Sequence, residues 1–257
     1  MPVTRVRLLQ MELTWEDPAA NRARFSGWLA DGGENCLQVL PEMFSTGFSM
    51  ASGQLAESMD GETVSWMQHQ ADRLQSPLCG SLIIRDGGYY NRFVYCEPGS
   101  PPVSYDKRHL FRMAGEHTHY APGDRCPVFE FDGLRFKPQV CYDLRFPVYA
   151  RNRGDYDVLI YVANWPAARR EHWITLLRAR AIENLCYVVA VNRVGTDGNG
   201  ISYSGDSCVV DFRGETLLDL GNREAAADIR LDKAALEEYR EAFPAWQDAD
   251  DFRLLPP

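Results

Sequence analysis

The sequence has little of what marks membrane, secreted or nucleic-acid-binding proteins. No apolar run approaches the ~20 residues that a membrane-spanning helix needs, and Met1 to Gln10 lacks the basic-then-apolar order of a signal peptide. Basic residues are outnumbered, with 27 Lys and Arg against 36 Asp and Glu and a formal charge of −9. Because nucleic acids and anionic membranes are bound by basic surfaces, we expect neither as a partner. We expect a cytoplasmic protein.

Paired cysteine motifs are also missing. The seven cysteines are odd in number and scattered, without a C-x-x-C pair, which argues against a disulfide framework and a zinc knuckle. We expect most of them to be buried apolar residues. His117 and His119 resemble a pair of metal ligands, but no third ligand stands at a recognisable spacing. The sequence therefore predicts no bound metal.

What the chain does contain suits a single α/β domain. Its 257 residues are 45% apolar, which is enough for a large buried core. No internal repeat, low-complexity tract or Gly/Ser-rich linker divides the chain. We predict one domain over residues 1–257, with a C-terminal extension from about residue 232.

Strand and helix patterns alternate along the chain. The continuous apolar runs 158–162 and 187–191 are typical of strands that are covered on both faces. The predicted strands are 3–13, 36–40, 78–84, 128–131, 134–140, 158–163, 187–192 and 207–212, with turns at Asp86-Gly87-Gly88 and Asp132-Gly133. The first predicted helix begins at the Asp17 cap and stops at Gly32-Gly33, and the second has Val64, Met67, Ala71 and Leu74 on one face. Two more are predicted near 147–153 and over 171–184. The last begins at the Asp232 cap and ends at Pro244, with Leu236, Tyr239 and Phe243 facing inward.

Reactive side chains of complementary type follow three of these short apolar segments. Glu42 comes after the strand that ends at Leu40, Lys107 follows Tyr105-Asp106, and Cys141 follows Val140. In α/β sheets the functional groups lie where strands pass into loops. An acid, an ammonium and a thiol could therefore converge.

Such a trio has a specific chemistry. A carboxylate can take the proton of a thiol while a nearby ammonium stabilises the negative charge. When the sulfur attacks a carbonyl, the ammonium and a backbone N–H just after the nucleophile, that of Tyr142, can stabilise the developing oxyanion. The protonated acid then donates its proton to the leaving amine, and the deprotonated acid activates water. This cycle hydrolyses an amide without histidine or metal.

The segments around the trio resemble those of the nitrilase or carbon-nitrogen hydrolase superfamily. The matching segments span roughly residues 5 to 220, in the family's order. They are Pro41-Glu42, Asp106-Lys107, Gly115-Glu116-His117 through Pro122-Gly123, Cys141-Tyr142-Asp143-Leu144-Arg145-Phe146-Pro147, Ala163-Asn164-Trp165-Pro166, the segment 178–184, and Asn192-Arg193-Val194-Gly195.

The resemblance implies a fold and an activity. The fold is a four-layer αββα sandwich, often paired into dimers, and we expect a homodimer or larger homo-oligomer. Within the superfamily the chain resembles the bacterial ω-amidases at residues 161–166, 192–200 and 205–207. Their reaction is hydrolysis of the terminal amide of a 2-oxo dicarboxylic acid monoamide, such as 2-oxoglutaramate or 2-oxosuccinamate. No cofactor is expected.

The resemblance also assigns roles around the Glu42, Lys107 and Cys141 triad. Glu116 matches a second glutamate that orients the lysine and the catalytic acid. Arg145 either binds the free carboxylate of the substrate or pairs with Asp143 or another acid. Asn164 and Trp165 are expected to form a wall of the pocket, although Trp165 also suits the core, and Phe48 is expected to provide an apolar wall beside Glu42.

Two other functions remain open. The chain could act on another substrate of the superfamily, which would be a nitrile, an N-carbamoyl amino acid or an aliphatic amide. It could also be a catalytically silent small-molecule-binding or scaffold protein that keeps the fold.

One residue departs from the superfamily pattern. Pro138 lies three residues before Cys141, where a residue with a free N–H is usual. Because proline removes one donor from the strand ladder, we predict a bulge or an unpaired stretch there.

Overall fold

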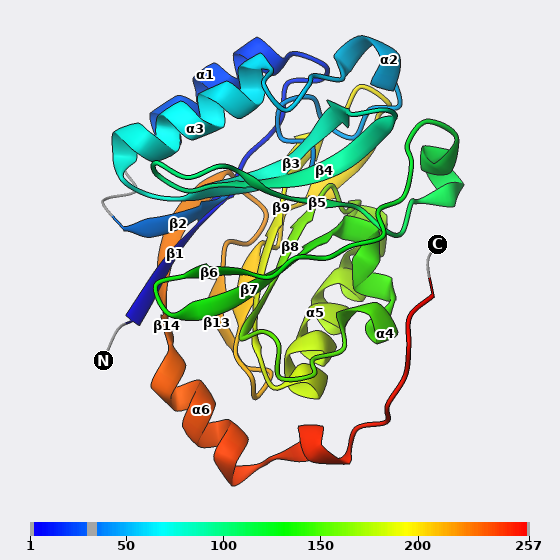
Figure 1. Cartoon of the computed structure of the whole chain (residues 1–257). Coiled ribbons are helices and arrows are strands. Elements are labelled where there is room, and N and C mark those ends of the chain that lie inside the picture. The colour runs from blue at the N-terminus through cyan, green and yellow to red at the C-terminus, as the bar shows by residue number, and fades with distance from the viewer. Residues whose placement is uncertain (1–2, 30–34, 256–257) are drawn as a thin grey trace.

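The computed structural model describes residues 3–29 and 35–255. Two six-stranded sheets lie face to face in the middle of the molecule, and helices cover the outer face of each (Figure 1). This is the four-layer αββα arrangement that was predicted.

The first sheet has the strand order β14-β1-β2-β3-β4-β5. Three strands in it are parallel, β1, β2 and β3, and the other pairs are antiparallel. Its strands are β1 (Val3–Gln10), β2 (Cys36–Val39), β3 (Leu78–Arg85), β4 (Tyr89–Cys96), β5 (Val103–Asp106) and β14 (Ala225–Asp232). The helices α1 (Pro18–Leu29) and α3 (Glu62–Leu74) cover its outer face, with the short α2 (Ser52–Leu55) nearby (Figure 1).

The second sheet has the order β13-β12-β9-β8-β7-β6. Its parallel strands are β7, β8 and β9. The strands are β6 (Phe129–Phe131), β7 (Leu134–Val140), β8 (Val158–Ala163), β9 (Tyr187–Asn192), β12 (Cys208–Val210) and β13 (Thr216–Asp219), and a separate hairpin joins β10 (Val194–Thr196) to β11 (Ser202–Ser204). The outer face carries α4 (Pro147–Ala150) and α5 (Arg170–Asn184) (Figure 1).

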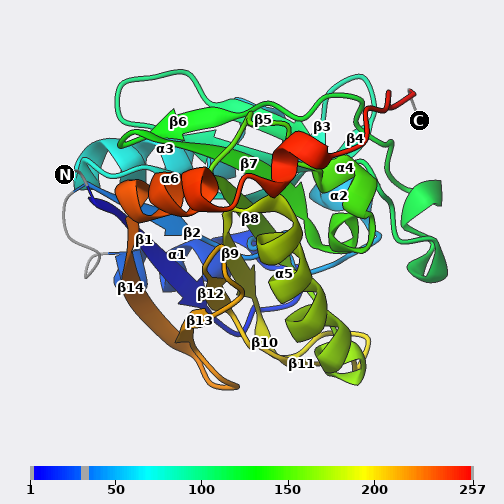
Figure 2. The same cartoon turned by 90° about the horizontal axis from the view of Figure 1, so that it is seen from below.

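The C-terminal part leaves the first sheet after β14. Helix α6 (Lys233–Ala242) follows, and the tail then runs along the face that also bears α4 and α5 (Figure 2). Arg108 holds the tail through a hydrogen bond to the carbonyl of Leu255 at 2.6 Å.

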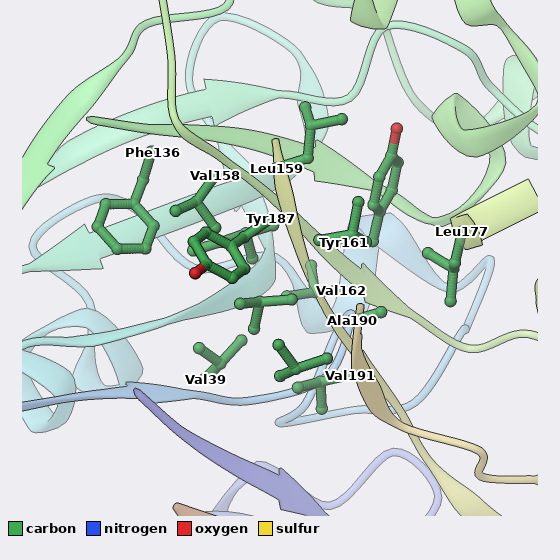
Figure 3. Packing of buried hydrophobic residues seen from close by; sticks show 14 of the residues in the cluster. Val39, Phe136, Val158, Leu159, Tyr161, Val162, Leu177, Tyr187, Ala190 and Val191 are labelled. Atoms are coloured by element: carbon green, nitrogen blue, oxygen red, sulfur yellow. The ribbon is translucent and has the colours of Figure 1, made fainter. Parts of the chain in front are cut away.

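The main apolar core extends through both sheets. Val39 of β2, Leu159 of β8 and Val191 of β9 belong to one cluster and have no exposed surface (Figure 3). A second cluster joins α1 and α3 to the first sheet, for example through Phe25 and Met67. Burial of this apolar surface is the main stabilising contribution to the fold.

Most of the predicted elements are present, with ends that differ by a few residues. Asp17 accepts a hydrogen bond from Ala20 N, and Asp232 caps α6, both as predicted. The first strand ends at Gln10 rather than residue 13. The predicted helix stop at Gly32-Gly33 lies outside the described residues.

One inward assignment was wrong. Phe243 is 54% exposed, because α6 ends at Ala242 and only Leu236 of that helix is fully buried. Tyr239 does pack against the main core, as predicted.

Of the two alternatives predicted at Pro138, a bulge or an unpaired stretch, the structure shows an unpaired stretch on the β6 side and no bulge against β8. The register between β7 and β8 is regular through Pro138 and Ile160. The pairing of β6 with β7 ends at Phe136, and alternation along the strand turns the nitrogen of Pro138 to that same side. The missing N–H therefore falls where β6 no longer pairs.

All seven cysteines are free thiols, and six of them are buried, as expected. Across residues 3–29 and 35–255, no helix combines the length and the apolar composition that crossing a bilayer would require.

Candidate active site

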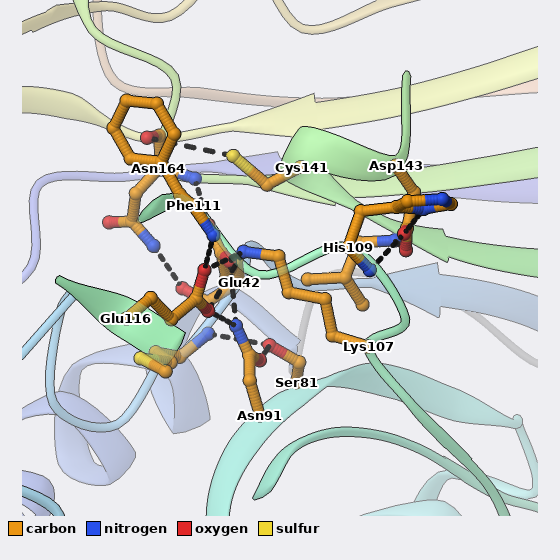
Figure 4. Close-up of polar contacts among 12 residues, drawn as sticks. Glu42, Ser81, Asn91, Lys107, His109, Phe111, Glu116, Cys141, Asp143 and Asn164 are labelled. Atoms are coloured by element: carbon orange, nitrogen blue, oxygen red, sulfur yellow. Dashed lines mark hydrogen bonds and ion pairs between the residues drawn. The ribbon is translucent and has the colours of Figure 1, made fainter. Parts of the chain in front are cut away.

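The structure brings Glu42, Lys107 and Cys141 together between the two sheets (Figure 4). Lys107 follows the end of β5, Cys141 follows the end of β7, and Glu42 lies three residues beyond β2. Glu42 and Lys107 have no exposed surface, and Cys141 is 9% exposed. Residues that are 65 positions apart in the chain thus share one buried polar cluster.

The loop that carries Glu42 folds tightly across β3. A Cβ atom at Gly80 would lie 3.0 Å from the Cβ of Leu40, so glycine lets the two segments approach closely without crowding. Ser81 then fixes the loop by accepting a hydrogen bond from Met43 N at 2.9 Å.

Both carboxylate oxygens of Glu42 are hydrogen-bonded. Oε1 accepts from Lys107 Nζ at 2.9 Å and from Asn91 Nδ2 at 2.8 Å, and Oε2 accepts from Asn164 N at 2.8 Å. Asn164 also donates its side-chain amide to the carbonyl of Glu42 at 2.6 Å. These bonds fix the orientation of the carboxylate.

Lys107 lies between two carboxylates. Its Nζ donates to both oxygens of Glu116, at 2.9 and 3.0 Å, as well as to Glu42. Burial alone would lower the pKa of Lys107, but the charges of Glu116 and Glu42 outweigh it and raise the pKa. Lys107 is therefore a permanent cation.

Glu116 has no exposed surface either. It is held by Lys107, by Asn91 Nδ2 at 3.2 Å, and by the backbone N–H of Phe111. Burial, together with the charge of Glu42, raises its pKa despite the opposing effect of Lys107. One ammonium thus compensates two buried carboxylates.

Cys141 occupies a strained turn. Its φ angle is +46°, in the left-handed region that residues other than glycine rarely adopt. The turn opens the 3-10 helix Cys141–Arg145, which is held from α5 by a 2.6 Å hydrogen bond from Arg180 to the carbonyl of Leu144.

The pKa of the Cys141 thiol is raised above its ordinary value of 9.0. Burial is the main cause, and the charge of Glu42 raises the pKa further, against the effect of Lys107. A thiolate would place another negative charge near two carboxylates and one cation. The sulfur itself lies 3.9 Å from the carbonyl oxygen of Asn164, whose backbone N–H holds Glu42.

A cavity of about 350 Å³ opens onto the thiol. Its walls are mostly apolar and aromatic, and two arginines stand among them. The predicted residues Cys141, Tyr142, Arg145, Asn164, Trp165 and Phe48 all line it, together with Phe111, Met113, Ala114, Pro166, Ala168, Arg169, Ile201 and Tyr203.

Arg145 lines the cavity beside Trp165. Its guanidinium is 4.8 Å from the ring centroid of Trp165, and Nη2 is 2.9 Å from Nδ1 of His172. Asp143, its alternative partner, instead accepts from other groups. Within residues 3–29 and 35–255, no carboxylate lies within ion-pair distance of Arg145.

Sequence reasoning missed Asn91 and Arg169. Asn91 lies inside β4 and bridges Glu42 and Glu116. No local pattern singles out a polar residue that faces inward from a strand. Arg169 could have been found from its position five residues after Asn164, beyond a strand end.

The described residues contain no group of three or more His, Cys, Asp or Glu side chains that could hold an ion. His117 lines a separate hollow with Arg108 and Arg112.

Comparison with known proteins agrees with this geometry. The carbon-nitrogen hydrolase family profile matches residues 5–241. Omega-amidase YafV of Escherichia coli (strain K12) is 48% identical over 256 residues, covering 99% of this chain and 100% of that protein. The 2-oxoglutaramate amidase of Bacillus subtilis (strain 168) is 30% identical over 250 residues, covering 95% of this chain and 96% of that protein.

A solved structure is also very similar. XC1258 from Xanthomonas campestris, a CN-hydrolase superfamily protein with an arsenic adduct in its active site, superposes with a TM-score of 0.96. The two sequences are 46% identical, and the match covers 99% of this chain and 100% of that one.

Proposed function

The chain belongs to the carbon-nitrogen hydrolase family, and we propose on that premise that it is an ω-amidase. Its substrate would be a 2-oxo dicarboxylic acid monoamide such as 2-oxoglutaramate or 2-oxosuccinamate, and its products ammonia and the 2-oxo acid. The observation that carries the substrate class is Arg145, a guanidinium without a carboxylate partner among the described residues, on the wall of the cavity that contains the thiol.

The first half of the reaction forms a thioester. Glu42 takes the proton of Cys141 as the sulfur attacks the amide carbon, so that a C–S bond forms and the carbonyl electrons move onto oxygen. Lys107 and the backbone N–H of Tyr142 stabilise that oxyanion. The intermediate collapses, protonated Glu42 gives its proton to the nitrogen, and ammonia leaves.

The second half returns the enzyme to its resting state. Glu42, again a carboxylate, takes a proton from water as the water oxygen attacks the thioester. The C–S bond breaks, the carboxylic acid leaves, and the proton on Glu42 returns to the sulfur. Glu116 holds Lys107 in place throughout, through two hydrogen bonds.

The cavity walls provide the binding groups. Arg145 would bind the carboxylate at the far end of the substrate, and Trp165 supports the guanidinium by stacking. Asn164 Oδ1 is buried and has no hydrogen-bond partner among the described residues, so it can accept an N–H of the amide. Phe48, whose ring centroid is 5.2 Å from Lys107 Nζ, excludes water from the ammonium.

The test is ammonia release from 2-oxoglutaramate by the purified protein, with Cys141→Ala as the inactive control. We expect release by the unchanged chain only. A panel with a neutral aliphatic amide, a nitrile and an N-carbamoyl amino acid separates this proposal from other superfamily activities. Faster turnover of the neutral amide would refute the role of Arg145 in substrate choice.

A catalytically silent binding protein would give a different result. A small electrophile would then label Cys141 no faster than the buried Cys79, as judged by intact mass and peptide mapping. We expect faster labelling at Cys141, because this thiol lies near the carboxylate of Glu42 and lines a cavity, whereas the charge that acts on Cys79 is that of Cys96.

We also propose that the chain forms a homodimer or larger homo-oligomer. The elements α4 and α5 and the C-terminal tail are seen together in Figure 2. Each of them carries an exposed apolar side chain, Val148 on α4, Ile182 on α5 and Trp246 in the tail. Exposed apolar residues that gather on one face are typical of interfaces. Light scattering on the purified protein measures the mass, and a value of 29.2 kDa would refute the proposal.

A further inference from the structure

Asp143 joins the segments that carry Lys107 and Cys141. Its carboxylate has no exposed surface and lies two residues after Cys141. Oδ1 accepts from His109 N at 3.0 Å and from His109 Nδ1 at 2.7 Å (Figure 4). Oδ2 accepts from Tyr105 OH at 2.7 Å.

The partners of this carboxylate come from both sheets. Tyr105 and His109 flank Lys107 by two residues on each side, at the end of β5 in the first sheet. The fourth hydrogen bond, from Val140 N at 2.9 Å, comes from the residue before Cys141 in the second sheet. The carboxylate of Asp143 thus connects the residues on either side of Lys107 with the segment that carries Cys141.

We propose that the pair Asp143 and His109 is a positioning device, which sets the sulfur of Cys141 at its working distance from Lys107 and Glu42. Neither residue lies against the reacting atoms, so both would act through the residues they hold. This role goes beyond the proposed reaction but rests on it, because the rate of that reaction is what the pair would control.

The nucleophile turn needs such a restraint. The φ angle of +46° at Cys141 is unfavourable for a residue with a side chain and persists only where the surroundings enforce it. Asp143 bonds the residue just before the turn and is itself part of the 3-10 helix just after it. Without the links from His109 and Tyr105 to Asp143, the turn would lose its connection to the lysine segment.

His109 makes two separable contacts. Its Nδ1–H donates to Asp143, because a carboxylate oxygen can only accept. Its ring also stacks on Phe146, with centroids 3.8 Å apart and planes at 9°, and meets the edge of Tyr149. Packing and hydrogen bonding can therefore be tested one at a time.

Two substitutions separate these contacts. His109→Phe keeps a flat ring that can stack but removes the donor. His109→Asn keeps a side-chain N–H near the position of Nδ1 but loses most of the stacking. A packing role predicts that the Phe variant works and the Asn variant fails, whereas a positioning role predicts the reverse.

The experiment measures kcat and KM with 2-oxoglutaramate, together with the rate at which a small electrophile labels Cys141. For His109→Phe we expect kcat to fall about 10²-fold, which is the usual effect of a misplacement of about 1 Å, while KM stays within about twofold. His109→Asn should recover most of the rate. The same changes at His69, which is exposed on α3, serve as controls and should have no effect.

The outcomes separate this inference from the proposed function. Wild-type kcat in His109→Phe, or a rise in KM alone, would overturn the positioning role. If the unchanged chain hydrolyses no amide, the proposed function fails, but the labelling rates of the two His109 variants still decide the positioning role. Should His109→Phe unfold, Tyr105→Phe removes a donor to the same carboxylate, and unchanged kcat in that variant would also overturn the proposal.

Discussion

The apolar core and the charged cluster of this molecule are equally buried, but they differ in polarity and in what burial does to stability. Around β8 and β9 the interior is apolar, and Leu159 and Val191 have no exposed surface. At the ends of the strands Glu42, Lys107 and Glu116 are just as inaccessible. Burial stabilises the first region and costs free energy in the second, because ions lose their hydration there. The exposed fraction of a side chain therefore does not tell a residue of the apolar core from a residue of the candidate active site.

The buried charges of the polar region do not balance one another. One cation faces two carboxylates, and burial together with this imbalance raises the pKa of both Cys141 and Glu116. A cluster selected only for stability would have paired its charges or replaced them by apolar groups. We expect substitutions in the two regions to separate activity from stability.

The largest effect is expected from Glu42→Gln. The variant keeps the size of the side chain but can no longer take the proton of Cys141, so kcat should fall about 10²- to 10⁴-fold. The free energy of unfolding, measured in urea, should change much less than the activation free energy calculated from kcat. Glu130→Gln on the exposed face of β6 is the matched control. Comparable activity of both variants would contradict the assignment of Glu42.

The apolar region should give the opposite result. Leu159→Ala is expected to lower the free energy of unfolding by about 2–5 kcal/mol, because it leaves a cavity in a close-packed cluster. The kcat of the folded variant, measured well below its melting temperature, should stay close to that of the unchanged chain. Leu217→Ala, at a 41% exposed site, should cost less than about 0.5 kcal/mol. A loss of kcat as large as in Glu42→Gln would contradict the separation of the two regions.

A smaller effect is expected from Arg145→Gln at the boundary between the regions. Loss of a charged hydrogen bond to the substrate carboxylate should raise KM for 2-oxoglutaramate about 10- to 100-fold. Turnover of a neutral aliphatic amide should not change. Arg178→Gln, on the exposed side of α5, is the control. An equal loss with both substrates would indicate a structural role.

The smallest signal is expected from titration of Cys141. Because the folded-state pKa of this thiol is raised, the folded protein favours S–H. The resulting stabilisation is complete below the ordinary pKa of 9.0 and is lost as pH rises from there through the raised pKa. The thiolate absorbance of the unchanged chain minus that of Cys141→Ala should therefore stay flat from neutral pH to about pH 9. A titration near neutral pH would show that Lys107 outweighs burial and Glu42.

The layers could be predicted through the family resemblance, and several helices and strands through their apolar patterns. The apolar run 158–162 lies within β8, and the segment with Val64 and Met67 on one face is α3. Strand β14 was missed because Ala225-Ala226-Ala227 has no strand propensity. It forms because residues 225–232 pair with all of β1, a partner about 220 residues away.

The site could be predicted only in part for the same reason. Glu42, Lys107 and Cys141 stand in recognisable segments, so their convergence could be anticipated. The pairing of Arg145 could not be anticipated. The acid nearest to it in the sequence, Asp143, accepts hydrogen bonds from Tyr105 and His109, which are 38 and 34 positions from Asp143 in the chain. Contacts of that range depend on how the sheets dock, and no local pattern encodes them.

The bonds between Glu42 and Asn164 have a consequence for assembly. Glu42 belongs to the first sheet, whereas the peptide N–H that holds it follows β8 of the second. Each sheet can gain its own strands without completing the catalytic constellation. During refolding from denaturant, recovery of turnover should therefore lag behind the circular-dichroism signal of the strands and follow the slow step in which the two layers meet.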